Sequence, residues 1–230
     1  MKRRTKVILI FLLLLTVGGS IAYEEHQNKH TPYKVLANND LGTVERTTYG
    51  CSTSAETIAL ITGIHPTEKI SIDPEIQAAQ EYVNEHSDVK VLHYNVNVVK
   101  DADDHDKGES NGEKLAHDYV IPDVKKSDAN CVILSHSYTD GNGEGCYLAT
   151  PQMDDASVEI AKKILATSDF GYRQNTGGEA YDSASAEQVP CPIAKAGYPT
   201  FVYEIPESMT GENSTNMAKD LFSQMVKYTS

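Results

Sequence analysis

Three short apolar segments, spread widely along the chain, constrain the fold most. They are Thr57–Thr62, Cys131–Leu134 and Thr200–Tyr203. Each is too short for a typical buried helix and is rich in residues that favour strands, so we expect three strands buried on both faces. Strands of this kind are typical of parallel sheets that helices cover on both sides.

Helical patterns separate these expected strands. A helix is predicted to begin at Asp73-Pro74, where apolar residues recur three and four positions apart and proline suits the first turn. Val158–Leu165 and Met217–Met225 have similar amphipathic patterns. Val89–Val99 alternates imperfectly and indicates a further strand, whereas the strongly polar Asp101–Glu113 predicts a solvated loop. The alternation of strands and helices predicts an α/β fold with a mostly parallel twisted sheet and helices on both faces.

The first 22 residues predict an export signal. The cationic start Lys2–Lys6 precedes the apolar run Val7–Val17, and the small residues Ser20 and Ala22 fit a cleavage site. The competing interpretation is an uncleaved membrane anchor through residues 7–22, because the apolar run is short for a span yet long for a signal. Under both interpretations the rest of the chain is extracytoplasmic, either secreted or anchored to the membrane.

The remaining chain is expected to form an arm followed by one domain. Residues 23–44 are polar and lack apolar periodicity, which is typical of a linker. Residues 45–230 have a length that suits a single domain. Loss of the leader would leave 16 Lys and Arg against 33 Asp and Glu, a formal charge of −17. This acidity argues against nucleic acid as a partner, so residues 7–22 provide the only predicted membrane contact.

Four cysteines follow the leader, at Cys51, Cys131, Cys146 and Cys191. An exported chain can form disulfides, and three pairings are possible among which the sequence does not choose. None of the cysteines forms a CxxC pair, which argues against a thiolate zinc site. We expect structural bridges or buried thiols in preference to catalytic cysteines.

Residues able to bind a metal or move a proton follow all three buried segments. His65 and Glu68 follow the first, His136 the second and Glu204 the third. Each alone is more often a loop histidine or a solvated glutamate, but the carboxyl ends of parallel strands meet at one edge of a sheet. Two imidazoles and a carboxylate are a ligand set of catalytic zinc. The pattern therefore predicts one Zn²⁺ ion on His65, Glu68 and His136, with Glu204 as the acid/base catalyst.

The segments around these residues resemble the zinc carboxypeptidases and the related succinylglutamate desuccinylase/aspartoacylase deacylases. Ile61–Glu68 resembles the zinc-binding HxxE segment, Ile133–Tyr138 the segment of the third ligand, and Gly197–Glu204 the strand that ends in the catalytic glutamate. The resemblance covers about Thr57–Pro206 and keeps the family order His, Glu, His, Glu. It implies an eight-stranded mixed sheet, a zinc-activated water, and hydrolysis of a C-terminal peptide bond or another amide.

The chain departs from this family in its positive charges. The family carries arginines that polarise the scissile carbonyl and hold the substrate carboxylate, but there is no arginine between Glu68 and His136. The candidates for substrate binding are instead Arg173, Lys100 and Tyr198. A lysine is a point charge and cannot hold a carboxylate through two parallel hydrogen bonds.

Together these features predict an exported zinc-dependent hydrolase of peptide or other amide bonds, similar to the metallocarboxypeptidases. Two alternatives stay open at this stage. The chain could deacylate small N-acyl compounds, because the missing arginines leave no evident grip on a peptide carboxylate. It could also be a catalytically degenerate metal-binding or wall-associated module.

Overall fold

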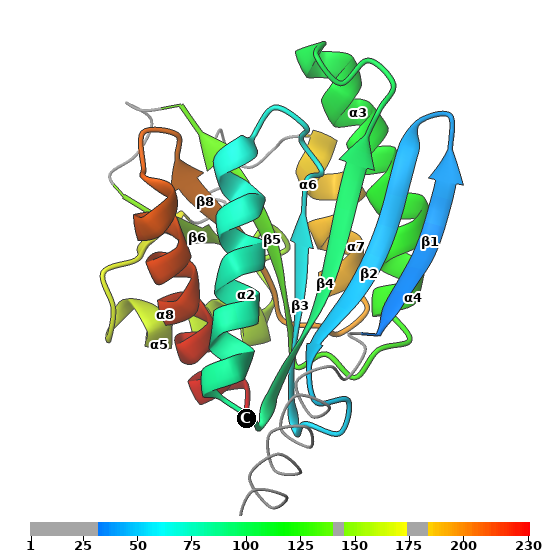
Figure 1. The fold of residues 1–230 in the computed structure, drawn as a ribbon. Helices are drawn as coiled ribbons and strands as arrows, with labels where there is room; N and C mark the ends of the chain where they lie inside the picture. Colours follow the sequence, from blue (N-terminus) through cyan, green and yellow to red (C-terminus); the bar gives the residue numbers. More distant parts are fainter. Residues whose placement is uncertain (1–31, 140–144, 174–183) are drawn as a thin grey trace, which may run out of the picture. The chain divides into compact units, whose positions relative to one another are not determined.

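Eight strands form one mixed sheet in the order β1-β2-β4-β3-β5-β8-β6-β7, as Figure 1 shows for the computed structural model. The strands are β1 (Tyr33–Asn39), β2 (Gly42–Gly50), β3 (Glu56–Thr62), β4 (Val89–Val98), β5 (Cys131–Tyr138), β6 (Tyr147–Ala149), β7 (Gly171–Arg173) and β8 (Thr200–Pro206). The four central strands β4, β3, β5 and β8 are parallel, whereas β2 and β6 run antiparallel to their central neighbours. The mixed eight-stranded sheet implied by the family resemblance is confirmed.

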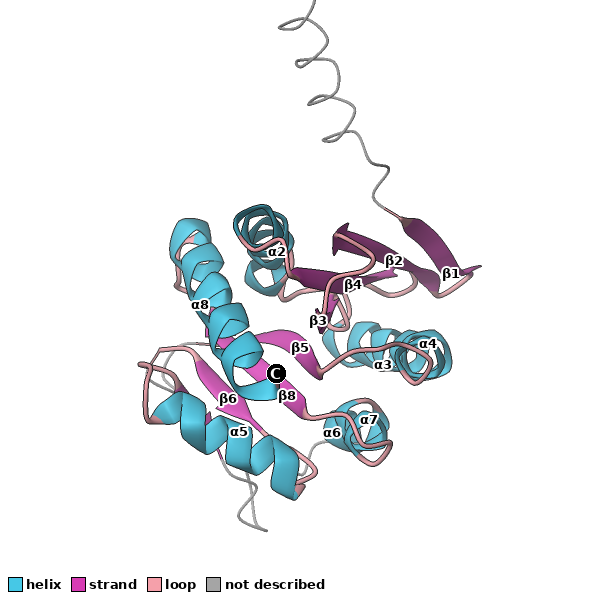
Figure 2. Ribbon diagram, turned by 90° about the horizontal axis from the view of Figure 1, so that it is seen from below, coloured by secondary structure: helices cyan, strands magenta, loops and turns pink. Residues whose placement is uncertain are grey.

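Helices cover both faces of this sheet. They are η1 (Lys69–Ser71), α2 (Asp73–Glu85), α3 (His105–Leu115), η2 (Ala116–Val120), α4 (Ile121–Val124), α5 (Asp155–Leu165), α6 (Ala184–Gln188), α7 (Pro190–Ala194) and α8 (Gly211–Thr229). Helices α2 and α8 lie on one face, and α3, α4, α6 and α7 lie on the other (Figure 2). Helix α5 packs into the same core as α2 and α8.

The central strands are buried on both faces, as their apolar runs predict. Along β3, Ile58 and Leu60 face the core under α2 and α8, while Ala59 and Ile61 face the core under α3 and α4. All four are at most 1% exposed. Burial of an isoleucine or leucine side chain stabilises a fold by roughly 1.5–3 kcal/mol. Because β3 contributes side chains to both cores, it links the two cores through the sheet.

The structure describes residues 32–139, 145–173 and 184–230. The leader over residues 1–22 and residues 23–31 of the expected arm lie outside these ranges, so export stays a prediction. Within the described ranges, no helix is long and apolar enough to cross a membrane.

The expectation of an irregular arm up to residue 44 is wrong for its second half. Tyr33–Asn39 forms the edge strand β1, paired antiparallel with β2, so the folded domain begins well before residue 45. Only Ala37 of this strand is buried. An edge strand with a single buried side chain has no apolar alternation, which explains why the sequence pattern did not reveal it.

The expectation of a solvated loop over Asp101–Glu113 is also wrong, because helix α3 begins at His105. Asp104 caps the helix, and its side chain accepts a 3.1 Å hydrogen bond from the backbone N–H of Lys107. The buried residues of α3 are Gly108, Gly112, Glu113 and Leu115. A buried face made largely of glycine and glutamate gives no hydrophobic period, although the cap signal was present in the sequence.

Three of the four cysteines adopt one of the two expected states, whereas Cys51 is exposed. Cys131, Cys146 and Cys191 are buried thiols and form no bridges. Burial raises the pKa of Cys131 to about 12 and that of Cys146 to about 11. A thiol with so high a pKa carries almost no nucleophilic thiolate at neutral pH, which agrees with a packing role.

Candidate metal centre

The carboxyl ends of the central strands bring the predicted site residues together. His65 and Glu68 lie in the loop between β3 and α2, whereas His136 and Glu204 lie within their strands because β5 and β8 extend further than expected. His136 and Glu204 are register partners in the parallel pair β5–β8. Side chains of such partners project from the same face, so both face the layer of α3, α6 and α7.

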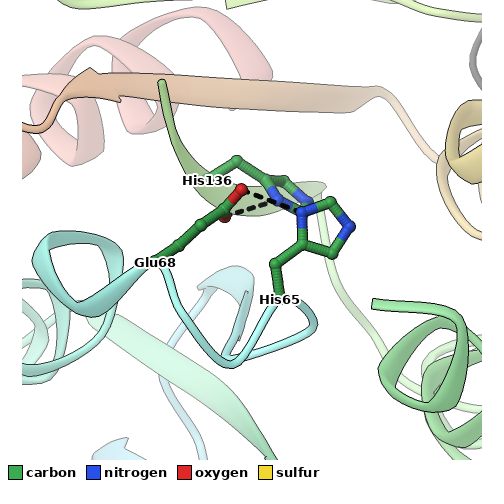
Figure 3. Close-up of side chains that lie close together, drawn as sticks. All are labelled: His65, Glu68 and His136. Atoms are coloured by element: carbon green, nitrogen blue, oxygen red, sulfur yellow. Dashed lines mark hydrogen bonds and ion pairs between the residues drawn. The ribbon is translucent and has the colours of Figure 1, made fainter. Parts of the chain in front are cut away.

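The carboxylate of Glu68 faces both imidazoles, whose ring centroids are 4.4 Å apart (Figure 3). Its Oε1 is 2.8 Å from Nδ1 of His65, and its Oε2 is 2.9 Å from Nδ1 of His136. One ligand atom from each of these three residues lies within 4.8 Å of the other two. The convergence expected from the strand ends is therefore present in the fold.

A glycine shapes the loop that carries the first two residues. Gly63 has φ 76°, and a Cβ atom there would lie 2.2 Å from the carbonyl oxygen of Val96 in β4. Only glycine combines this conformation with so close an approach to a neighbouring strand. At the other end of the loop, Oε2 of Glu68 also accepts a 3.2 Å hydrogen bond from the backbone N–H of Ser137. This bond holds the loop against β5.

Helix α3 supplies two further carboxylates that the sequence analysis missed. A Cβ at Gly112 would lie 1.7 Å from the carbonyl oxygen of Ile64, so the helix backbone lies directly against the residue before His65. This approach puts Glu113 Oε1 3.7 Å from Nε2 of His65, and Glu109 Oε1 3.6 Å from its Nδ1. Glu109 and Glu113 are four positions apart in the sequence. That spacing places two side chains on the same surface of a helix, but no helix was expected in this segment.

The electrostatics of the cluster match those of a cation site. Burial opposes the charge on His65, but the nearby carboxylates of Glu113 and Glu68 outweigh it and raise the pKa of His65 to about 10. Burial likewise opposes the charge on Glu68, but the charge and hydrogen bond of His136, followed by those of His65, lower the pKa of Glu68 to about 2. A proton on His65 thus supplies positive charge where a metal ion would supply it.

The donor set and its spacing fit zinc. A tetrahedral zinc with ligand bonds of 2.0–2.2 Å separates its ligand atoms by roughly 3.4 Å. The nitrogen–oxygen distances of 2.8 and 2.9 Å and the 4.8 Å limit for the whole group lie on either side of that value. Among the described residues, the buried Nε2 atom of His65 has no hydrogen-bond partner, and Glu113, 3.7 Å away, is placed to orient that ring.

A cavity of about 150 Å³ adjoins the two histidines. Its lining comprises Ile64, His65, Glu109, Leu134, His136, Ala186, Val189, Pro190, Val202 and Glu204. Glu204 therefore shares this space with both imidazoles, as its predicted catalytic role requires. The described lining contains no lysine or arginine, and most of its wall is apolar.

The three residues predicted to bind substrate have different outcomes. Tyr198 precedes β8, six residues and roughly 20 Å of extended chain before Glu204, and its hydroxyl donates to the carbonyl of Ser127. The candidate metal centre lies at the other end of the strand, and Tyr198 does not line its cavity. Lys100 follows the carboxyl end of β4 but is exposed and does not line the cavity. Arg173 lies at the end of β7, on the face that carries Glu204.

The fold is similar to that of several solved peptidases. A metallo-carboxypeptidase from Burkholderia cenocepacia matches with a TM-score of 0.62 at 14% identity, over 88% of this chain and 65% of that chain. A metallo-carboxypeptidase from Pseudomonas aeruginosa, in complex with (2-guanidinoethylmercapto)succinic acid, matches with a TM-score of 0.58 at 14% identity, over 86% and 65%. The LapA aminopeptidase of Legionella pneumophila matches with a TM-score of 0.59 at 12% identity, over 94% and 63%.

These comparisons establish the architecture. The chain has the α/β fold of the metallo-carboxypeptidases, with a sequence that has diverged far from theirs. It spans about two-thirds of the length of the first matched structures. No family model and no curated protein sequence matches the chain.

Proposed function

We propose that this protein is an exported, zinc-dependent hydrolase of peptide or other amide bonds. One observation carries the proposal: the Nδ1 atoms of His65 and His136 both face the carboxylate of Glu68, beside a cavity that Glu204 also lines. The fold of solved metallo-carboxypeptidases supports it. The predicted leader supports an extracytoplasmic location.

Each residue of the site would have a role that follows from its position. His65, Glu68 and His136 would hold one Zn²⁺ ion, and Glu113 would fix the ring of His65 through Nε2. Zinc, when bound, would polarise a substrate carbonyl and lower the pKa of a water molecule. The apolar wall of the cavity would exclude bulk water and strengthen the electrostatic interactions inside.

Glu204 is the proposed acid/base catalyst. It lies in the strand next to His136, and its carboxylate lines the cavity. From there it would take a proton from the attacking water and give it to the leaving nitrogen of the amide. No other carboxylate combines this strand position with the cavity lining among the described residues, since Glu109 enters from a helix.

A deacylase of small N-acyl compounds is the second candidate. The observation that favours it is the described cavity lining, which contains no cation that could hold a peptide carboxylate beside the metal. Turnover of N-acyl amino acids without turnover of peptides would select it. The third possibility, a degenerate metal-binding module, requires intact zinc binding without any hydrolysis.

The test combines metal analysis with one substitution. The purified protein should contain one zinc per chain, and Glu204→Gln should keep the zinc while lowering amide hydrolysis by roughly 10²–10⁴-fold. Glu207→Gln is the matched control, because Glu207 directly follows β8 and is exposed. A wild-type protein without bound zinc, or an active Glu204→Gln variant, would rule out this mechanism.

A further inference from the structure

Glu109 presents a carboxylate to the cavity beside the candidate metal centre. It extends from helix α3 and lines the same space as His65, His136 and Glu204. Its side chain is 23% exposed, and its Oε1 lies 3.6 Å from Nδ1 of His65 and 3.2 Å from Nε2 of His105. A substrate that reaches the metal ligands therefore also meets Glu109.

Metal binding would change the contacts of this carboxylate. Nδ1 of His65 can carry a proton that faces Glu109, but a histidine nitrogen that coordinates zinc carries none. With zinc on Nδ1, the partner left to Glu109 among the described residues would be His105, whose side chain is 73% exposed. Because a partly buried carboxylate is stabilised by a hydrogen-bond donor, a substrate that supplies one would be favoured there.

The cavity has an excess of negative charge. Four carboxyl groups line it or contact the imidazole of His65, and they belong to Glu68, Glu109, Glu113 and Glu204. When all four are ionised, one Zn²⁺ ion would offset two of the four charges. The largely apolar wall lowers the local dielectric constant, so the remaining charge acts strongly on a group inside the cavity. A cation is favoured in this space, and a carboxylate is opposed.

Neither the described lining nor the internal segments outside the described ranges supply a lysine or arginine to offset this charge. The described lining contains neither residue type. Residues 140–144 and 174–183 also contain neither, and both segments include acidic residues. The composition of these segments therefore leaves the sign of the charge unchanged.

The cations of α3 and β7 do not change this balance. Lys107 of α3 pairs with Asp104 at 2.8 Å. Lys114 of the same helix pairs with Asp118, also at 2.8 Å. Arg173 of β7 is on the sheet face of the site but is not part of the described lining. The negative charge of the cavity thus favours a cation that the substrate brings.

The position of Glu109 limits how far this cation can lie from the reacting bond. Its Oε1 is 3.6 Å from the histidine nitrogen that would bind the metal. An ammonium group that donates a hydrogen bond of about 2.8 Å to this oxygen lies within roughly 6.4 Å of that nitrogen. This span corresponds to a few covalent bonds, so the ammonium group belongs to the part of the substrate next to the scissile bond.

We propose that Glu109 binds an ammonium group of the substrate next to the scissile amide bond. The inference rests on the proposed function and adds a substrate class to it, namely amides with a primary amino group a few bonds from the carbonyl that is attacked. A primary ammonium is a compact charge with three donors, so it can bind Glu109 and still contact a second acceptor. Glu204 keeps its role as acid/base catalyst, and the apolar wall contacts the uncharged part of the substrate.

Binding of three matched thiols to the zinc-loaded protein tests this preference without catalysis. A thiolate is a zinc ligand, so 3-mercaptopropylamine, 3-mercaptopropanol and 3-mercaptopropionate present a cation, a neutral group and an anion, respectively, beside the metal. Calorimetry gives the three affinities. We expect the amine to bind roughly ten- to a hundredfold more tightly than the alcohol, as for a hydrogen bond between charged groups, and the acid to bind more weakly than the alcohol.

One substitution assigns the preference to Glu109. Glu109→Gln should lower the amine-to-alcohol affinity ratio to about one while the protein keeps one zinc per chain. Asp118→Asn is the matched control, because it removes an exposed carboxylate just after α3, and it should leave the ratio unchanged. Chelation of zinc by the amine is also controlled, since a preference from chelation would survive Glu109→Gln. Zinc content and the unfolding temperature show whether each variant keeps its metal and its fold.

The outcomes distinguish this inference from the proposed function. A wild-type protein that takes up no zinc would overturn both. In the zinc-loaded protein, equal binding of the amine and the alcohol, or a preference for the amine that survives Glu109→Gln, would overturn the inference alone. Loss of zinc from the Glu109→Gln variant would make Glu109 a metal ligand and would also overturn the inference.

Discussion

Glu68 and Glu75 lie seven residues apart and are both largely buried, yet their surroundings differ. The carboxylate of Glu68 contacts two imidazoles, and although burial opposes its charge, His136 and His65 lower its pKa to about 2. Glu75, in the first turn of α2, is 0% exposed, and neither of its oxygens has a hydrogen-bond partner among the described residues. Burial raises its pKa well above the usual range.

The comparison shows that burial alone does not make a site. A buried carboxylate without partners keeps its proton and becomes a neutral core group, whereas one with two histidines stays charged and can bind a cation. Glu75 also affects the pKa of Tyr203, which packs in the core under α2 and α8.

The largest effect is expected from removing the paired carboxylate. Glu68→Ala should abolish stoichiometric zinc binding, because the site loses the ligand that also positions both imidazoles. Glu75→Gln should keep one zinc per chain, since Glu75 lies outside the cluster. Metal analysis after dialysis measures the zinc content of both variants. Equal zinc contents would show that the two glutamates do not differ in their contribution to metal binding.

The unpaired carboxyl group of Glu75 should make the free energy of unfolding depend on pH. The folded protein keeps the proton of Glu75 above pH 4.5 while the unfolded chain releases it, so the free energy of unfolding falls as pH rises toward the raised pKa. The slope from this group approaches about 1.4 kcal/mol per pH unit. Tyr203 and Cys146, which interact with Glu75, stay neutral in this range because burial raises the pKa of both.

Denaturant unfolding between pH 5 and 7 measures this slope. Glu75→Gln should remove it and leave the variant relatively more stable at the higher pH. Glu81→Gln is the matched control on the exposed side of the same helix, where the carboxylate pairs with Lys219. A wild-type slope unchanged by Glu75→Gln would show that this carboxyl group is ionised in the folded state, contrary to its burial.

A backbone contact holds the partners of the site in place. Gly112→Ala should destabilise the fold by about 1–3 kcal/mol, because the new methyl group would meet the carbonyl of Ile64 and push α3 away from His65. Gly211→Ala is the control, since a Cβ there meets nothing closer than 3.9 Å. Thermal unfolding compares the two, and identical stabilities would show that α3 is not locked against the loop.

The sequence predicted the clustered site residues better than their surroundings, for a physical reason. His65, Glu68 and His136 follow apolar runs long enough to identify as strands, and parallel strands gather their ends at one edge. Helix α3 was missed because its buried face contains Gly108 and Gly112. Its helical character depends on the fit of two glycines against a distant loop, which only the tertiary structure shows.

The setting of Arg173 was hidden for a different reason. Strands β6 and β7 have three residues each, and so short a segment shows no periodicity that distinguishes a strand from a loop. The residue could be named from the scarcity of arginines in the chain. Its guanidinium carbon lies 4.2 Å from the centroid of the Tyr147 ring, a contact that depends on pairings between segments far apart in the sequence.

The smallest expected effect concerns the carboxylate behind His65. Glu113→Gln keeps the shape of the side chain but removes its charge, so the ring of His65 loses the negative charge 3.7 Å from its Nε2 and becomes a weaker ligand. Zinc affinity should fall by roughly 10–100-fold while the fold stays intact. Competition with a chelator measures the change, and Glu212→Gln in the first turn of α8 serves as a surface control. An unchanged affinity would mean that Glu68 alone fixes both imidazoles, and that the contrast with Glu75 rests on a single pair of contacts.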